Sequence, residues 1–157
     1  MWLVAIAAAA EPTLVVTDAG TIRGTVFVGA APDRVKALLL DPDQRLATVS
    51  GEGTRSTTEV DGACVLEHSD VPHPIRAVSY TVRSCPTATG VRSELVRSDD
   101  LTRLTSVWTV EVAEGGSRVT YELDAVPSFP LPSFVARASA KGGVYDALAA
   151  VARRFGS

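Results

Sequence analysis

The sequence predicts an α+β fold, in which a curved antiparallel sheet of about seven strands is covered by one long C-terminal helix. Two observations predict it. Residues 51–126 alternate apolar and polar side chains between short turns, and residues 131–155 repeat apolar side chains at helical spacing. One or two short helices are expected after the first strand. The 157 residues fit a single domain, residues 20–157, that is large enough to bury its own core.

The first strand and the short helices occupy residues 21–50. Thr21–Val28 alternates in the way typical of a strand with one buried face. Pro32 suits the first turn of a helix. That helix should end at Asp41, because the residue before a proline avoids the helical conformation. A second, poorly defined helical turn is expected before residue 50.

Six more strands are expected between residues 51 and 126. Turn residues such as Asp61-Gly62 and Gly115-Gly116 separate them, and such short connections imply that successive strands pair antiparallel. The last two strands alternate most clearly, so one face of each should be covered and the other wet. The expected strands are Gly53–Val60, Ala63–Ser69, Ile75–Cys85, Gly90–Arg97, Thr102–Val112 and Arg118–Val126.

The last helix is expected over Leu131–Phe155, where apolar residues recur every three or four positions. Gly142-Gly143 in its middle costs roughly 1 kcal/mol per glycine relative to alanine, so the helix kinks there or something approaches it closely. Three prolines between residues 127 and 132 fix the angle at which the helix leaves the sheet. Phe129 and Phe134 are expected to seal this corner, and the space between helix and curled sheet becomes an apolar cavity.

Charge and the N-terminus restrict the partners. The net charge is −3 and the basic residues are scattered, so nucleic-acid binding is not expected. Residues 1–10 are apolar and end in Ala8-Ala9-Ala10, a pattern that matches a signal-peptide cleavage site. The alternative is a short strand or a misassigned start. The segment is too short for a membrane span, which needs roughly 20 residues. We expect an exported, periplasmic or secreted monomer rather than a cytoplasmic one.

The two cysteines, Cys64 and Cys85, fall in neighbouring predicted strands. In an exported protein they could form a disulfide across the strands, and otherwise they are two small buried thiols. The two histidines, His68 and His73, have no metal-ligand spacing with them. We therefore expect no metal site and no cofactor.

Three segments resemble the START-like, or Bet v 1-like, superfamily, also called SRPBCC, which includes polyketide cyclase/dehydrase-type and lipid-transfer proteins. The resemblance implies the helix-grip fold and extends over nearly the whole chain after residue 20. It lies in the first strand and helix, in a proline-flanked turn before a long strand, and in the last strand with its proline-rich corner and helix. The segments are VFVGAAPDRVKALLLDPD, VPHPIRAVSYTVRS and VTYELDAVPSFPLPSFVARASAKGGVYDALAAVARR.

The sequence contains few groups suited to catalysis. Nucleophile-elbow, zinc-protease and phosphate-loop motifs are absent. His68 shares a predicted face with Cys64 and could point inward, although a lone strand histidine is commonly structural. Glu67 and Glu94 either form surface ion pairs with arginines of neighbouring strands or contribute an inward Arg–Glu pair that orients a ligand's head group.

Aromatic and hydroxyl side chains on the covered faces are either core or walls of a cavity. In the second case the hydroxyl groups would orient a bound molecule. The expected ligand-binding residues are His68, Tyr80, Ser106, Trp108, Tyr121, Phe129, Phe134 and Tyr145.

The predicted function is non-catalytic binding or transport of a hydrophobic small molecule, a lipid or an isoprenoid-like compound. One alternative, implied by the resemblance, is a polyketide cyclase or aromatase in which His68, Tyr80 and Tyr121 act. The other is a protein-interaction module whose cavity is filled by its own side chains. A binder should have a large apolar cavity, an enzyme a partly polar one, and an interaction module hardly any.

Overall fold

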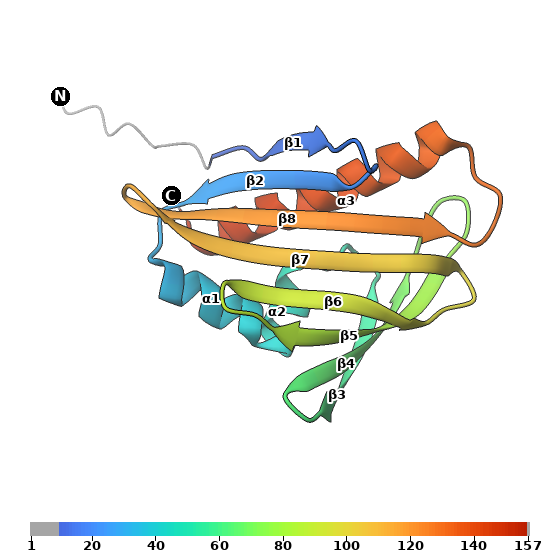
Figure 1. Ribbon diagram of the computed structural model, residues 1–157, viewed down its shortest axis with the longest axis horizontal. Helices are drawn as coiled ribbons and strands as arrows, with labels where there is room; N and C mark the ends of the chain where they lie inside the picture. Colours follow the sequence, from blue (N-terminus) through green and yellow to red (C-terminus); the bar gives the residue numbers. More distant parts are fainter. Residues whose placement is uncertain (1–9, 157) are drawn as a thin grey trace.

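The computed structural model describes residues 10–156 (Figure 1). The expected signal peptide therefore lies almost wholly outside the described residues. All strands form one antiparallel sheet in the order β1-β2-β8-β7-β6-β5-β4-β3, and the long helix α3 runs along it. The strands are β1 Thr13–Val16, β2 Ile22–Val28, β3 Arg55–Asp61, β4 Cys64–Val71, β5 Val78–Pro86, β6 Gly90–Arg97, β7 Leu101–Ala113 and β8 Gly116–Pro127. The helices are α1 Pro32–Leu40, α2 Pro42–Val49 and α3 Ser133–Arg154.

The predicted α+β fold is confirmed, but the described sheet has eight strands, not about seven. The additional strand is β1, which pairs antiparallel with β2 from Thr13 opposite Thr25 to Val16 opposite Ile22. Its four residues, TLVV, lack the alternation of the other strands, and it lies at an edge of the sheet. A run this short and this uniform carries no periodic signal, which is why the sequence did not reveal it.

The two short helices meet at Asp41. Pro32 occupies the first turn of α1, as expected, and α1 ends one residue before Asp41. The carboxylate of Asp41 then caps α2 by accepting a hydrogen bond of 3.1 Å from the backbone N–H of Gln44. This tight junction fixes the direction of α2, and it brings Arg45 of that helix into the interior, where only 4% of its surface is exposed.

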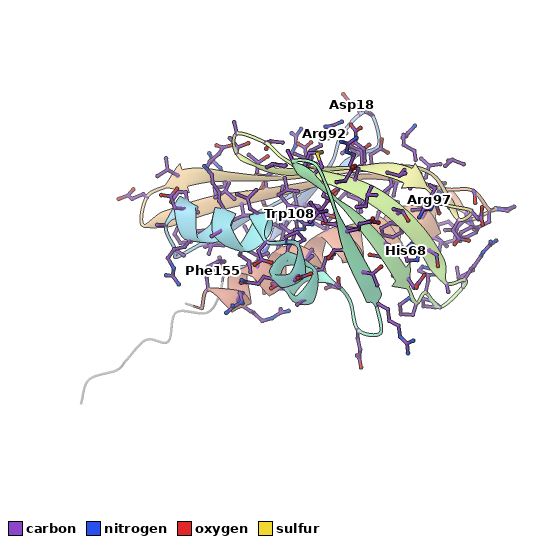
Figure 2. All side chains as sticks on the ribbon, turned by 90° about the horizontal axis from the view of Figure 1, so that it is seen from below. Asp18, His68, Arg92, Arg97, Trp108 and Phe155 are labelled. Atoms are coloured by element: carbon purple, nitrogen blue, oxygen red, sulfur yellow. A yellow bond between two sulfur atoms is a disulfide. The ribbon has the colours of Figure 1, made fainter. Side chains whose placement is uncertain are left out.

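The hydrophobic core fills one end of the space beneath the sheet. It is made by β2, β6, β7 and β8, by α1, and by the C-terminal half of α3. Trp108 lies in the interior between sheet and helices (Figure 2) and stacks on Tyr121, with 4.1 Å between the ring centres. The fully buried members are Val26, Val28, Val35, Leu39, Val119, Val144, Leu148 and Val151.

Helix α3 is a single helix through Gly142 and Gly143. Its buried side chains all follow the glycines, from Val144 to Ala152. A Cβ atom added at either glycine would meet no atom within 4 Å, so the absence of a Cβ is not needed for close packing at either position. The first half of α3 has no fully buried side chain, and Ala140 is its one contact with the core cluster among the described residues.

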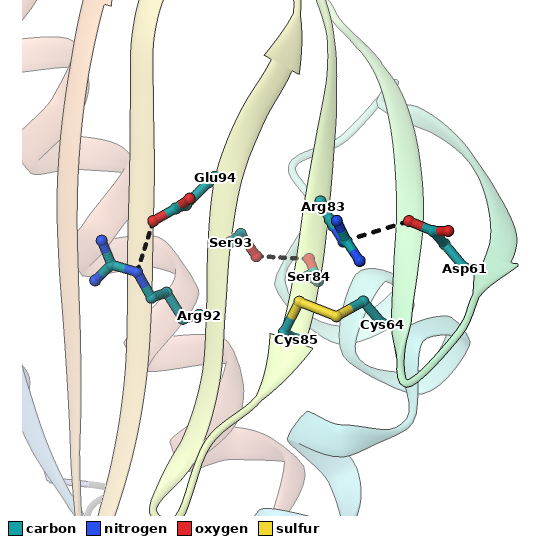
Figure 3. Close-up of a disulfide and its surroundings, with 8 residues drawn as sticks. All are labelled: Asp61, Cys64, Arg83, Ser84, Cys85, Arg92, Ser93 and Glu94. Atoms are coloured by element: carbon teal, nitrogen blue, oxygen red, sulfur yellow. Dashed lines mark hydrogen bonds and ion pairs between the residues drawn. A yellow bond between two sulfur atoms is a disulfide. The ribbon is translucent and has the colours of Figure 1, made fainter.

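A disulfide joins Cys64, at the start of β4, to Cys85, near the end of β5 (Figure 3). Their Cα atoms are 4.4 Å apart. Beside it, Ser84 and Ser93 share a buried hydrogen bond of 2.6 Å between β5 and β6. Together these links join β4 to β5 and β5 to β6.

Candidate ligand cavity

A cavity of about 350 Å³ lies between the sheet, α2 and α3. Part of its border comes from the link between α2 and β3, at Ser50, Gly51 and Thr54, and part from α3 at Gly143. Gly143 is both solvent-exposed and part of the lining, so the middle of α3 borders the mouth of the cavity. The glycine that costs helix stability thus keeps this side of the cavity free of a side chain.

Most of the lining is apolar and comes from every layer of the fold. Strands β4 to β8 supply one wall, and α2 and α3 supply the other. Such a surface favours a ligand that is itself apolar, because both surfaces leave water on binding. The apolar lining residues are Leu46, Val49, Val71, Val78, Val82, Leu101, Leu104, Trp108, Leu123, Ala125 and Ala147.

One part of the wall is polar and contains a buried ion pair. Arg45 of α2 and Glu67 of β4 are each 4% exposed and contact each other through their charged groups. Arg45 Nη1 also donates a hydrogen bond of 2.9 Å to the carbonyl oxygen of Leu39. Burial lowers the pKa of Arg45. The same pair lines a second, smaller cavity of about 280 Å³ that also reaches Cys85.

Two tyrosines face the same cavity. Burial raises the pKa of Tyr121 to about 12, and it also raises the pKa of Tyr80. Side-chain hydrogen bonds act in the opposite direction: Ser106 lowers the pKa of Tyr121, and Ser69 lowers the pKa of Tyr80. Both phenols therefore keep their protons at neutral pH and are available as hydrogen-bond donors inside the cavity.

The structure brings together four of the residues that the sequence suggested as ligand-binding. They are Tyr80, Ser106, Trp108 and Tyr121, and all line the cavity. Their role in binding stays a prediction.

His68 lies elsewhere, because its neighbours Glu67 and Ser69 line the cavity and successive strand side chains point to opposite faces. Its ring hydrogen-bonds to Thr81 at 3.0 Å and to Asp70 at 3.2 Å. The expected inward orientation of His68 is therefore not what the structure shows.

The expected seal at the proline-rich corner also differs from the structure. Phe134 is 74% exposed at the start of α3, and Tyr145 is 37% exposed further along it. Phe129 lies under the guanidinium group of Arg76, 4.8 Å from its ring centre. None of these three aromatic residues lines the cavity.

The sequence left the role of Glu67 open and gave no indication of Arg45. Strand β4 has apolar residues on both faces near its start, so its pattern did not settle which face is inward. Glu94, the other acidic candidate, pairs with Arg92 at 2.9 Å on the surface. An arginine on a short helix with a weak pattern has no sequence signal that marks it as buried.

Within residues 10–156 no group of three or more His, Cys, Asp or Glu side chains is arranged to hold a metal ion. In the same range no helix is long and apolar enough to cross a membrane. The polar groups that line the cavity are one ion pair, two phenols, and serine and threonine hydroxyl groups in a mainly apolar wall.

Comparison with known proteins shows the fold. No family model and no curated protein matches the chain. Solved structures do: a START superfamily protein from Mycobacterium smegmatis has a TM-score of 0.67 at 15% identity, over 86% of this chain and 96% of that one. The Zhui aromatase/cyclase from Streptomyces sp. R1128 has a TM-score of 0.70 at 16% identity, and the match covers 85% of this chain and 92% of that one. A STAR-related lipid transfer protein fragment from Xanthomonas axonopodis has a TM-score of 0.66 at 20% identity, and the match covers 95% of this chain and 94% of that one. The chain thus has the START-like, helix-grip fold.

Proposed function

We propose that this protein binds, and can carry, a hydrophobic small molecule in the cavity between its sheet and α3. The observation that carries the proposal is a cavity of about 350 Å³ with a mainly apolar lining and one polar end. Ligand sites typically measure roughly 300–1,000 Å³ and combine apolar walls with a few polar groups. The volume lies at the small end of that range, which favours one chain or an isoprenoid over a two-chain lipid.

Removal of apolar surface from water would drive binding. Each Å² of buried apolar surface contributes roughly 25 cal/mol before the costs of association. The route inward lies between Gly143 of α3 and the link from α2 to β3, since both border the cavity. Fold neighbours named for lipid transfer and for aromatase/cyclase activity are compatible with this proposal.

Catalysis is the weaker alternative for this cavity. An effective general acid or base has a pKa near the working pH. Tyr121 has a pKa of about 12, and Arg45 is held in an ion pair with Glu67. His68, the remaining candidate, lies outside the cavity. Binding without covalent chemistry agrees better with these groups. A protein-interaction module is also less favoured, because its own side chains would fill this space.

We propose in addition that the protein works in an oxidising compartment, such as the periplasm or the extracellular space. The support is the disulfide between Cys64 and Cys85, since such bonds persist mainly outside the reducing cytosol. Trapping of free thiols in intact cells tests this. The proposal requires that Cys64 and Cys85 resist alkylation until a reductant is added.

Native mass spectrometry of the purified protein, followed by solvent extraction, tests the binding function. We expect an added mass that disappears on denaturation, or that is acquired after incubation with a mixed lipid extract. A protein that stays at its own mass under both conditions would rule out the proposed function.

The two glycines of α3 offer a matched pair of variants. Gly143→Leu should occupy the mouth of the cavity and lower the amount of bound ligand, because Gly143 lines the cavity. Gly142→Leu adds the same side chain in the same helix at a position that does not line it. Neither substitution should destabilise the helix, because glycine costs about 1 kcal/mol there and a Cβ atom at either position meets no atom within 4 Å. Equal binding by both variants would place the ligand elsewhere.

A further inference from the structure

We propose that the cavity selects ligands whose head group is polar but uncharged, such as an alcohol or a ketone, and discriminates against the carboxylate of the same chain. This inference rests on the proposed function and adds the chemical class of the head group. It follows from the charges already present at the polar end of the cavity.

The charges at this end are balanced. Among the described residues that line the cavity, only Arg45 and Glu67 are ionisable as a cation and a carboxylate. They form an ion pair with each other, and each is 4% exposed. Arg45 is further held by its hydrogen bond to the Leu39 carbonyl oxygen. The guanidinium charge is therefore neutralised before any ligand arrives.

An anionic head group would upset this balance. Placed beside the intact pair, a carboxylate adds a buried charge without a partner, which is strongly unfavourable. If it replaced Glu67 as the partner of Arg45, the Glu67 carboxylate would itself be left buried and unpaired. A cationic head group beside the intact pair would likewise be a buried charge without a partner. As a new partner for Glu67 it would leave Arg45 buried and unpaired.

A neutral head group can use the remaining polar atoms without breaking the pair. Tyr80 and Tyr121 keep their phenolic protons, because burial raises both pKa values. Their hydroxyl groups, with that of Ser106, can donate to a ligand oxygen or accept from a ligand hydroxyl. Two other lining serines are already engaged, since Ser69 bonds to Ser56 at 2.8 Å and Ser93 to Ser84 at 2.6 Å.

Farnesol and farnesoate form a matched pair of probes, because they share an isoprenoid chain and differ in head-group charge. Binding is measured at about pH 8, where a carboxylic acid is ionised. The readout is the fluorescence of Trp108, which lines the cavity, in a Trp2→Phe background that leaves it the sole tryptophan. We expect farnesol to bind roughly 10- to 100-fold more tightly than farnesoate. Farnesoate binding as tightly as farnesol overturns the inference and leaves the proposed function standing. Binding of neither probe, with no ligand found by mass spectrometry, overturns the function itself.

Substitution of Glu67 should shift the selectivity toward the carboxylate. Glu67→Gln keeps the size of the side chain but leaves the Arg45 charge unpaired, so farnesoate should gain about tenfold or more relative to farnesol. Glu94→Gln is the control, because it removes the same charge from a surface pair with Arg92. It should leave the ratio unchanged. An unchanged ratio in Glu67→Gln overturns the inference.

The opposite substitution provides a second test if Glu67→Gln does not fold. Arg45→Gln leaves the Glu67 carboxylate unpaired, so the cationic probe farnesylamine should gain relative to farnesol, again about tenfold or more. The surface control is Arg92→Gln. The two variants are expected to favour probes of opposite charge, and a variant that folds without its expected shift contradicts the charge-balance argument.

Discussion

At the scale of single residues, Tyr121 links the core to the cavity. One face of its ring stacks on Trp108 at 4.1 Å, and the residue also lines the cavity. Its surroundings hold the pKa at about 12, compared with an ordinary value of 10. Because the pKa of Tyr121 differs between the folded and unfolded chains, the free energy of unfolding depends on pH.

Stability should fall as the pH rises from 10 toward 12. In this window an unfolded Tyr121 loses its proton while a folded one keeps it, so ionisation favours the unfolded chain. Below pH 10 the contribution is fully present. The loss is about 1.4 kcal/mol per pH unit for one group, and Tyr80 acts in the same direction. Urea unfolding at about pH 8 and about pH 11 measures it. Tyr121→Phe should lose less stability between these conditions than the parent, and an equal loss would contradict the argument.

Residue-scale features of the site were only partly predictable. Alternation along β7 and β8 placed Ser106, Trp108 and Tyr121 on covered faces, and these residues line the cavity. The pairing of Arg45 with Glu67 could not be predicted, because it joins a short helix to a distant strand. Sequence periodicity describes one element at a time and carries no information on such contacts.

At the scale of elements, predictability followed the strength of the periodic signal. The β6 boundaries were predicted exactly as Gly90–Arg97, and α1 ended before the predicted Asp41-Pro42. Strand β5 begins at Val78 instead of the expected Ile75, and residues 72–77 form a loop. In that loop His73 accepts a hydrogen bond from the backbone N–H of Ile75 at 3.1 Å. A side chain that satisfies the local backbone competes with the strand ladder.

The disulfide should stabilise the β4–β5 pair and, through it, the whole sheet. It links residues 21 positions apart, and closing a loop of this size is worth about 3 kcal/mol through the unfolded chain. Cys64→Ala/Cys85→Ala should therefore unfold at lower urea concentration, by about 3 kcal/mol in the free energy of unfolding. Adding reductant to the parent protein should reproduce the loss, and it should leave the double variant unaffected. Unfolding of parent and variant at the same urea concentration would show that the bond does not constrain the chain.

At the scale of the whole molecule, the fold divides its interior into a packed end and an open end. The core lies under α1 and the second half of α3, whereas the cavity lies beside α2 and the glycines of α3. The packed end can stabilise the fold while the open end binds a ligand. A ligand that fills the cavity adds contacts to the less densely packed end, so binding and global stability should be coupled.

Thermal unfolding measures that coupling. A ligand at about 100 times its Kd stabilises the folded state by about 2.7 kcal/mol. For a chain of 157 residues this corresponds to a rise in Tm of roughly 5–10 °C. Farnesol should therefore raise the Tm of the parent protein and of Gly142→Leu by similar amounts. Gly143→Leu should start from an equal or higher Tm and gain much less, because its new side chain occupies the border of the cavity. A full gain in Gly143→Leu would mean that farnesol stabilises the protein from another site, and the link between the open end and binding would then be wrong.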